Sequence, residues 1–148
     1  MNDRRSRTAT PKPVDLMGLL HTAYAAQDAV EARLAPLGLS LAKLAALSAL
    51  AAAPDGLPLG QLADRLSCVK SNITQLVDRL EADGFVARQL DPRDRRTKLA
   101  ALTAAGRRAC AEATRMQQET ERDLSKRLTR DEAQRLGALL AKVAKAPE

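Results

Sequence analysis

The segment from Val69 to Asp83 places polar side chains opposite an apolar stripe. The stripe has the three- and four-residue steps of a helix and consists of Ile73, Leu76, Val77 and Leu80. The opposite face and its flanks carry Lys70, Ser71, Asn72, Thr74, Gln75, Asp78 and Arg79. Asn and Gln can form two hydrogen bonds with adenine, and Ser and Thr can bond several bases. These side chains suit a helix that reads base edges in the major groove of DNA; an ordinary solvated helix face is the alternative.

A basic segment follows this helix. From Arg88 to Lys98 the cations are Arg88, Arg93, Arg95, Arg96 and Lys98, and the anions are Asp91 and Asp94, so the net charge is five minus two, or +3, in eleven residues. Proline and two aspartates between Asp91 and Arg96 predict a hairpin loop. Arginine suits the narrow, negative minor groove. We expect Asp94 to orient a neighbouring arginine through a salt bridge.

Apolar periodicity and capping residues predict the elements that position these two segments. Helices are expected at Val14–Ala35, Leu41–Ala53, Leu59–Leu66, Val69–Asp83, Thr103 to about Arg127, and from Thr129 to about residue 146. Ser40 is expected to cap the second helix, Gly84 to end the fourth in a left-handed conformation, and Thr129 with Glu132 to form a capping box. Strands are expected at Phe85–Leu90 and Thr97–Leu102. The fold class is therefore mainly α with a small β wing: about six helices and one β-hairpin.

The third and fourth helices have the spacing of a helix-turn-helix. Ala63 is small enough for two helices to cross closely, and Ile73 and Leu76 follow it by ten and thirteen residues. Cys68 falls at the apolar position of the turn. Ser67 stands where such turns often carry glycine, so we expect some backbone strain there. Because recognition helices read mainly with their N-terminal residues, we expect Lys70 to Gln75 to make the main contacts.

Composition limits the function classes. The 148 residues suffice for one domain, and the net charge of +6 with a pI near 9.8 favours a polyanionic partner. Aromatic residues are only 1% of the chain, which disfavours modules that stack single-stranded bases. The two cysteines form no disulfide framework. With no apolar run of membrane-spanning length and no secretory signal, we expect a cytoplasmic protein with no membrane partner.

Enzyme chemistry finds no support in the sequence. It has no glycine-rich phosphate loop, no Cys/His cluster and no histidine near a plausible nucleophile. We therefore expect no catalytic residue, metal or cofactor. A different class stays open, in which the winged unit docks onto an acidic protein without binding a specific DNA sequence. A steep dependence of affinity on salt, together with preference for one duplex, would favour the DNA reader.

Several stretches resemble the MarR family of regulators. They are Leu62–Leu66, Ile73–Val86, the loop Asp91–Arg96, and Leu99–Thr103 with Gly106. The resemblance extends over residues 14 to 145 and departs from the family at Cys68 and Val69. It implies that Arg96 is the wing arginine that enters the minor groove, that Asp94 braces it, and that Lys70 to Gln75 contact bases and phosphates.

The polar and basic composition of residues 1–13 predicts a disordered arm. The resemblance also implies an assembly and a function. Residues 14–148 are expected to form one domain, with a winged helix-turn-helix at 41–102 and dimerisation helices at 14–36 and 103–146. A homodimer would bind an inverted repeat of double-stranded DNA with recognition helices about 34–36 Å apart. The protein would regulate transcription, most simply as a repressor, and a small molecule that alters this separation would release it.

Two control inputs are conceivable. A small aromatic or anionic effector would be held by His21, Tyr24 and Lys43, although Tyr24 could instead be core and Lys43 simply solvated. Alternatively, the regulator could sense thiol oxidation at Cys68, since the N-terminus of the reading helix can lower a thiol pKa. A buried structural cysteine is the plainer interpretation of Cys68, and packing is the plainer one of Cys110.

Overall fold

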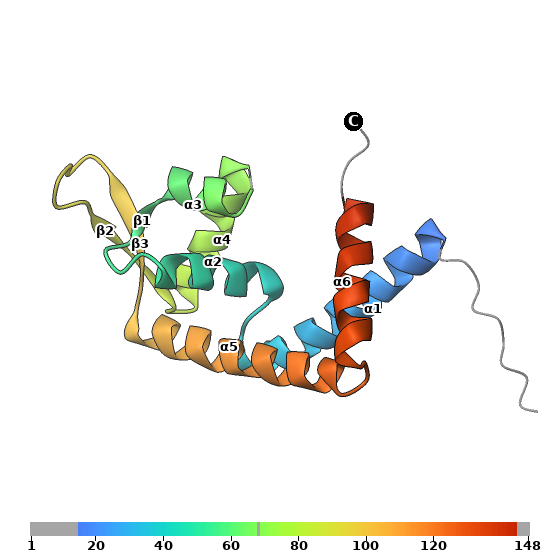
Figure 1. Cartoon of the computed structure of the whole chain (residues 1–148). Helices are drawn as coiled ribbons and strands as arrows, with labels where there is room; N and C mark the ends of the chain where they lie inside the picture. Colours follow the sequence, from blue (N-terminus) through green and yellow to red (C-terminus); the bar gives the residue numbers. More distant parts are fainter. Residues whose placement is uncertain (1–14, 68, 145–148) are drawn as a thin grey trace, which may run out of the picture.

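The computed structural model describes residues 15–67 and 69–144 (Figure 1). The elements are α1 (Leu16–Leu34), η1 (Ala35–Leu37), α2 (Leu41–Ala51), β1 (Leu57–Pro58), α3 (Leu59–Arg65), α4 (Lys70–Ala82), β2 (Val86–Leu90), β3 (Lys98–Leu102), α5 (Ala104–Ser125) and α6 (Arg130–Ala144). The predicted mainly α fold with a small β wing is confirmed. Helix and strand ends differ from the expected ones by at most two residues. The expected basic arm at 1–13, Val14, Cys68 and residues 145 and 146 lie outside the described residues.

The wing contains one strand more than the expected hairpin. β2 and β3 pair antiparallel, from Val86 opposite Leu102 to Leu90 opposite Lys98. β1 adds to the other edge of β3, with Leu57 opposite Ala100. Gly56 permits this close approach, because its φ is +88° and a Cβ there would lie 2.8 Å from the carbonyl oxygen of Ala100. A two-residue strand is too short to show periodicity, so sequence patterning could not find it.

The predicted helix caps are present. The hydroxyl of Ser40 accepts a hydrogen bond of 3.2 Å from the backbone N–H of Lys43. Gly84 has a φ of +77°, as expected for the left-handed residue that ends α4. At the start of α6, the backbone N–H of Thr129 donates to Glu132 at 2.7 Å and the N–H of Glu132 donates to the Thr129 hydroxyl at 3.3 Å. Local sequence therefore sets these helix boundaries.

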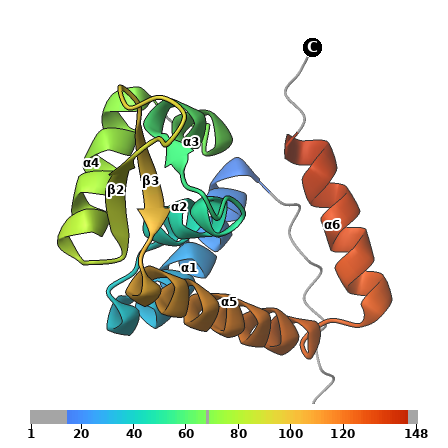
Figure 2. The same ribbon diagram turned by 90° about the vertical axis from the view of Figure 1, so that its left-hand side faces the viewer.

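Residues 41–102, the winged unit, pack around an aliphatic core. α2, α3, α4 and the sheet contribute Leu47, Leu50, Leu57, Leu62, Ala63, Ile73, Val77, Leu80, Val86 and Ala100. Ala63 is only 1% exposed, as the close helix crossing requires. Figure 2 shows α4 and the sheet on one side of α2, with α5 crossing below. The core thus fixes α4 with its polar face outward.

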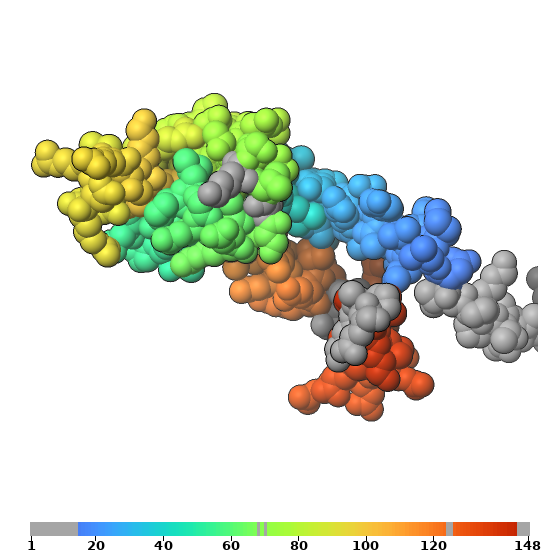
Figure 3. Space-filling model, turned by 90° about the horizontal axis from the view of Figure 1, so that it is seen from above, coloured from blue at the N-terminus to red at the C-terminus, as the bar shows by residue number. Residues whose placement is uncertain are grey.

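α6 and the first half of α1 lie away from the winged unit. Figure 3 shows the wing at the left of the molecule, the start of α1 at the right and α6 at the lower right. Every described residue of α6 is exposed, and its apolar side chains Leu136, Leu139, Leu140 and Val143 are between 42% and 64% exposed. α1 likewise exposes Leu16, Met17, Leu20 and Tyr24. The single chain therefore leaves two apolar helix faces uncovered.

In the described part of the chain no single helix has the length and apolar composition to cross a membrane; α1 through η1 and α2 would meet those two criteria only as a pair bent by 69°.

Candidate nucleic-acid interface

The polar face of α4 is exposed to solvent. Ile73, Val77 and Leu80 are at most 1% exposed and point into the core, and Leu76 is partly buried. The exposed residues of the helix include Ser71, Asn72, Thr74, Gln75 and Arg79. Lys70 begins the helix, but its side chain lies outside the described part. The predicted division of this helix into a buried stripe and a polar face is confirmed.

The turn before α4 carries the expected strain. Ser67 has a φ of +50°, in the left-handed region that favours glycine. Its backbone N–H donates to the carbonyl of Asp64 at 3.2 Å, which closes α3. Val69 precedes α4 with extended backbone and no side-chain cap. The turn therefore forms with serine in place of glycine, and α4 starts without a side chain that accepts its first N–H groups.

The wing loop is held by its two aspartates through backbone hydrogen bonds. Asp91 accepts from the N–H of Arg93 at 2.8 Å, and Asp94 accepts from the N–H of Arg96 at 3.0 Å and from the Thr97 hydroxyl at 3.2 Å. The expected salt bridge from Asp94 to an arginine side chain is wrong, because its carboxylate is turned to the loop backbone instead. Asp94 therefore stabilises the conformation of the loop without an ion pair to a loop arginine among the described residues.

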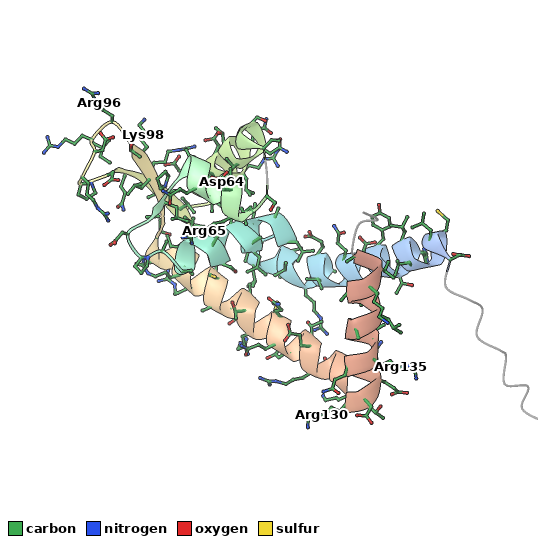
Figure 4. All side chains as sticks on the ribbon, turned by 45° about the horizontal axis from the view of Figure 1, so that its top comes forward. Asp64, Arg65, Arg96, Lys98, Arg130 and Arg135 are labelled. Carbon is green, nitrogen blue, oxygen red and sulfur yellow. The ribbon has the colours of Figure 1, made fainter. Side chains whose placement is uncertain are left out.

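The wing arginines are consequently available. Arg93, Arg95 and Arg96 are exposed, and their guanidinium groups form no hydrogen bond or ion pair within the residues that the structure describes. Figure 4 shows Arg96 at the tip of the loop, directed away from the body of the protein, with Lys98 nearer the strand. Three cations therefore stand on a loop whose backbone is fixed.

Arg88 is not part of this available charge. Its guanidinium forms ion pairs with Asp78 and Glu81 of α4, and its backbone N–H donates to Glu81 at 3.3 Å. The hydrogen bond that the guanidinium donates to Asp78 is the main cause that raises the pKa of Arg88 above its ordinary value. Counting cations along the sequence could not separate Arg88 from the loop arginines. The signal that could have done so is the spacing of Asp78 and Glu81, one helical turn apart.

Hydrogen bonds connect the turn between α4 and β2 to the start of α5. The hydroxyl of Thr103 donates to the carbonyl of Gly84 at 2.7 Å and accepts from the N–H of Gly106 at 3.0 Å. The backbone N–H of Thr103 donates to Phe85 at 3.0 Å. A Cβ on Gly106 would lie 1.9 Å from the carbonyl oxygen of Phe85. The Leu-Thr-x-x-Gly motif therefore joins α5 to the turn between α4 and β2.

The three candidate effector residues are not brought together. The ammonium of Lys43 lies 2.7 Å from Asp83 and donates to the carbonyl of Gly38 at 2.9 Å, so it holds the end of α4 and is not a solvated anion ligand. His21 and Tyr24 are exposed on the first half of α1, so Tyr24 is not core. The cleft between α1, α2 and α5 is lined by other side chains, among them Leu34, Leu44 and Met116.

The cysteines provide no described redox site. Cys110 is 6% exposed, and its sulfur lies 4.0 Å from the hydroxyl of Ser48, which agrees with a packing role. Cys68, the candidate for oxidation, lies outside the described residues. Among the residues that the structure does describe, no group of three or more His, Cys, Asp or Glu side chains could hold a metal ion.

A short helix, a tight turn, an exposed polar helix and a basic three-stranded wing define a winged helix-turn-helix protein. A family model described as the MarR family matches residues 37–97. Over 111 residues the chain is 33% identical to the multiple antibiotic resistance protein MarR of Escherichia coli K12, covering 74% of this chain and 76% of that protein. The chain belongs to the MarR family.

Two further comparisons bear on function. The chain is 41% identical over 72 residues to the transcriptional activatory protein BadR of Rhodopseudomonas palustris, covering 47% of this chain and 41% of BadR. A crystal structure of mutant E. coli MarR complexed with operator DNA has a TM-score of 0.73 and 29% identity, covering 89% of this chain and 100% of that one. The chain spans only 31%, 41% and 55% of the length of three curated relatives, all of which are named as transcriptional regulators or activators.

Proposed function

We propose that this protein is a sequence-specific, double-stranded DNA-binding transcriptional regulator. The observation that carries the proposal is the combination, on one unit, of the exposed polar face of α4 with a wing whose loop arginines are exposed and, within the described part of the chain, form no hydrogen bond or ion pair. Base edges in the major groove offer hydrogen-bonding groups to such a helix, and the adjacent minor groove attracts arginine. The operator DNA bound by E. coli MarR supports the same partner here.

The proposal assigns a role to each side chain. Ser71, Asn72, Thr74 and Gln75 lie on the exposed face toward the start of α4 and read bases, because the N-terminal part of a recognition helix enters the groove. Lys70 and Arg79 contact phosphates beside it. Arg96 enters the minor groove from the wing tip, while Arg93 and Arg95 contact the backbone on either side. Asp94 keeps the loop in the conformation that presents Arg96.

The protein acts as a homodimer in this proposal. An isolated amphipathic helix of 15 residues is marginal in water, so α6 needs a surface to cover Leu136, Leu139, Leu140 and Val143. The apolar face at the start of α1 also requires a surface that covers it. A second copy supplies both faces at once. Two-fold symmetry then places two recognition helices about one DNA turn apart, which requires an inverted repeat.

Repression is the proposed outcome, since a dimer seated on a promoter excludes other proteins from it. Because BadR is named as a transcriptional activatory protein, activation is the alternative that an experiment must distinguish from repression. A reporter gene behind the selected operator should be expressed less when the protein is present. Higher expression in its presence would assign it the activating role.

Release by a small aromatic anion completes the proposal. A cavity of about 560 Å³ lies between the end of α2, β3 and α5, with Leu50, Leu102 and Ala111 on its apolar side and Arg107 among its polar residues. A ligand there would lie at the junction of the winged unit and α5, where a small shift changes the separation of the recognition helices. Titration with 4-hydroxybenzoate should then release bound operator, and unchanged binding at saturating ligand would argue against this class of effector.

Selection of bound duplexes from a random pool, at two salt concentrations, tests the DNA-binding function. The proposal predicts an enriched inverted repeat with half-site centres about one turn apart. It also predicts a steep loss of affinity as salt rises, because phosphate contacts release counterions. Binding without an enriched motif would contradict sequence-specific reading. No duplex binding at either salt would favour the protein-docking alternative.

A further inference from the structure

Two carboxylates on the C-terminal half of α4 share one cation from the wing. Asp78 and Glu81 lie one helical turn apart, and both form ion pairs with Arg88 of β2. A second oxygen of Glu81 accepts a hydrogen bond from the backbone N–H of Arg88 at 3.3 Å. The contact therefore joins helix to strand through both the side chain and the main chain of Arg88.

Arginine is the residue type that this contact requires. Its planar guanidinium presents donors in a fixed fork, so it can hold two carboxylates in one geometry, whereas lysine offers a flexible point charge. The Arg88 side chain is 21% exposed, against 56% for Asp78 and 41% for Glu81, so the cation is the most enclosed of the three groups. The contact of Arg88 with both carboxylates is thus better placed to fix the orientation of α4 against β2 than an ordinary surface salt bridge.

The position of Arg88 lies between the two proposed DNA contacts. On α4 it engages the turn that follows the base-reading residues, and along β2 the chain continues to the loop that carries Arg96. For α4 to sit in a major groove while Arg96 reaches the adjacent minor groove, helix and wing must keep a fixed relation. A small rotation of α4 would weaken its hydrogen bonds to base edges, because these depend on direction. It would weaken the electrostatic contacts to phosphates less.

We propose that Arg88 is a positioning residue that fixes α4 against the wing and thereby sets the discrimination between operator and random duplex, without itself binding DNA. The inference rests on the proposed DNA-reading function. It assigns Arg88 a role different from that of the loop arginines, although all belong to the same basic stretch. The ion pairs with Asp78 and Glu81 already occupy the guanidinium, so its binding to phosphate would leave two carboxylates unpaired beside a polyanion.

A mutant cycle tests this role. The variants are Arg88→Gln, the double variant Asp78→Asn with Glu81→Gln, and the triple variant. Each is titrated with the most enriched duplex from selection by the wild-type protein and with a random duplex of equal length, over a series of salt concentrations. Arg130→Gln removes the same charge at the far end of the molecule from the wing and serves as the control (Figure 4).

Positioning predicts three results. Arg88→Gln should lower the ratio of operator affinity to random-duplex affinity about tenfold, the scale of one mismatched base pair. The salt dependence should keep its slope, because no phosphate contact is lost. In the carboxylate-free background the same substitution should cost nothing further, because Arg88 acts through those carboxylates. The Arg130→Gln control should match the wild type.

Other results would overturn the inference. If Arg88→Gln costs as much or more once the carboxylates are removed, or lowers the salt slope by about one, Arg88 contacts DNA directly. An unchanged affinity ratio, with or without a lower melting temperature, would leave Arg88 no part in specificity. Failure of the proposed function has a separate signature, since the wild-type protein would then prefer no duplex at all.

Discussion

Gly106 of α5 lies directly against the main chain of Phe85, so closely that a Cβ on Gly106 would stand 1.9 Å from the Phe85 carbonyl oxygen. Phe85 belongs to the turn between α4 and β2, and Thr103 bonds to the same turn. The start of the long helix is therefore attached to the turn that joins α4 to the wing, the two elements proposed to contact DNA. In the proposed function, this attachment is the route by which a shift of α5 would change the position of α4 and the wing.

Gly106→Ala should destabilise the protein by about 2–4 kcal/mol, because a rigid backbone oxygen must move to admit the methyl group. Denaturant unfolding monitored by helicity measures this change. Gly60→Ala is the matched control, since nothing lies within 4 Å of the added carbon. Helix propensity should make that variant neutral or up to about 1 kcal/mol more stable. Equal stability of the two variants would contradict the close approach at Phe85.

Leu139→Asp should convert the proposed dimer to monomer. Leu139 is 51% exposed on α6, and burial of one leucine per subunit contributes about 1.5–3 kcal/mol. Loss of two such contacts weakens dimerisation by about a hundredfold or more. Light scattering across a concentration series gives the oligomeric state.

Leu90→Asp provides the comparison for this substitution. Leu90 is similarly exposed, at 56%, but lies on β2, remote from α6. It should leave the oligomeric state unchanged. A wild-type monomer at all concentrations, or a dimer that survives the α6 substitution, would show that α6 does not form the interface.

Arg96→Ala should weaken operator binding by about 1–3 kcal/mol without lowering the melting temperature. The Arg96 side chain is exposed and forms no hydrogen bond or ion pair with the described residues that folding would lose. The slope of affinity against salt should fall as one cationic contact disappears. Fluorescence anisotropy and a thermal melt of the same preparation measure the two effects. A large drop in melting temperature would instead make Arg96 a structural residue.

Features set by neighbouring residues could be predicted from the sequence. The caps at Ser40 and Thr129, the left-handed Gly84 and the strain at Ser67 each depend on a few consecutive side chains, and all are present. The buried stripe of α4 follows from helical periodicity, which also fixes the opposite face as exposed. These local signals were enough to define the winged unit.

Features that depend on distant partners could not be predicted. β1 exists only because Leu57 and Pro58 meet β3 some forty residues later. Lys43 looked available to an anion until the fold brought Asp83 to it. Arg88 likewise became a link to α4 only when β2 folded back along that helix. The sequence gives the sign of each charge, but the partner of that charge depends on the topology.

Repeating the duplex selection with Gln75→Ala tests most directly whether α4 reads sequence. Gln75 is exposed on the polar face of α4, and a glutamine amide can form two hydrogen bonds with adenine. The variant should lose its preference at one base pair in each half-site, at symmetrical positions, while the rest of the motif and the salt slope stay as in the wild type. Uniformly weaker binding to every sequence, with the motif intact, would contradict base reading by Gln75 and make it a phosphate contact.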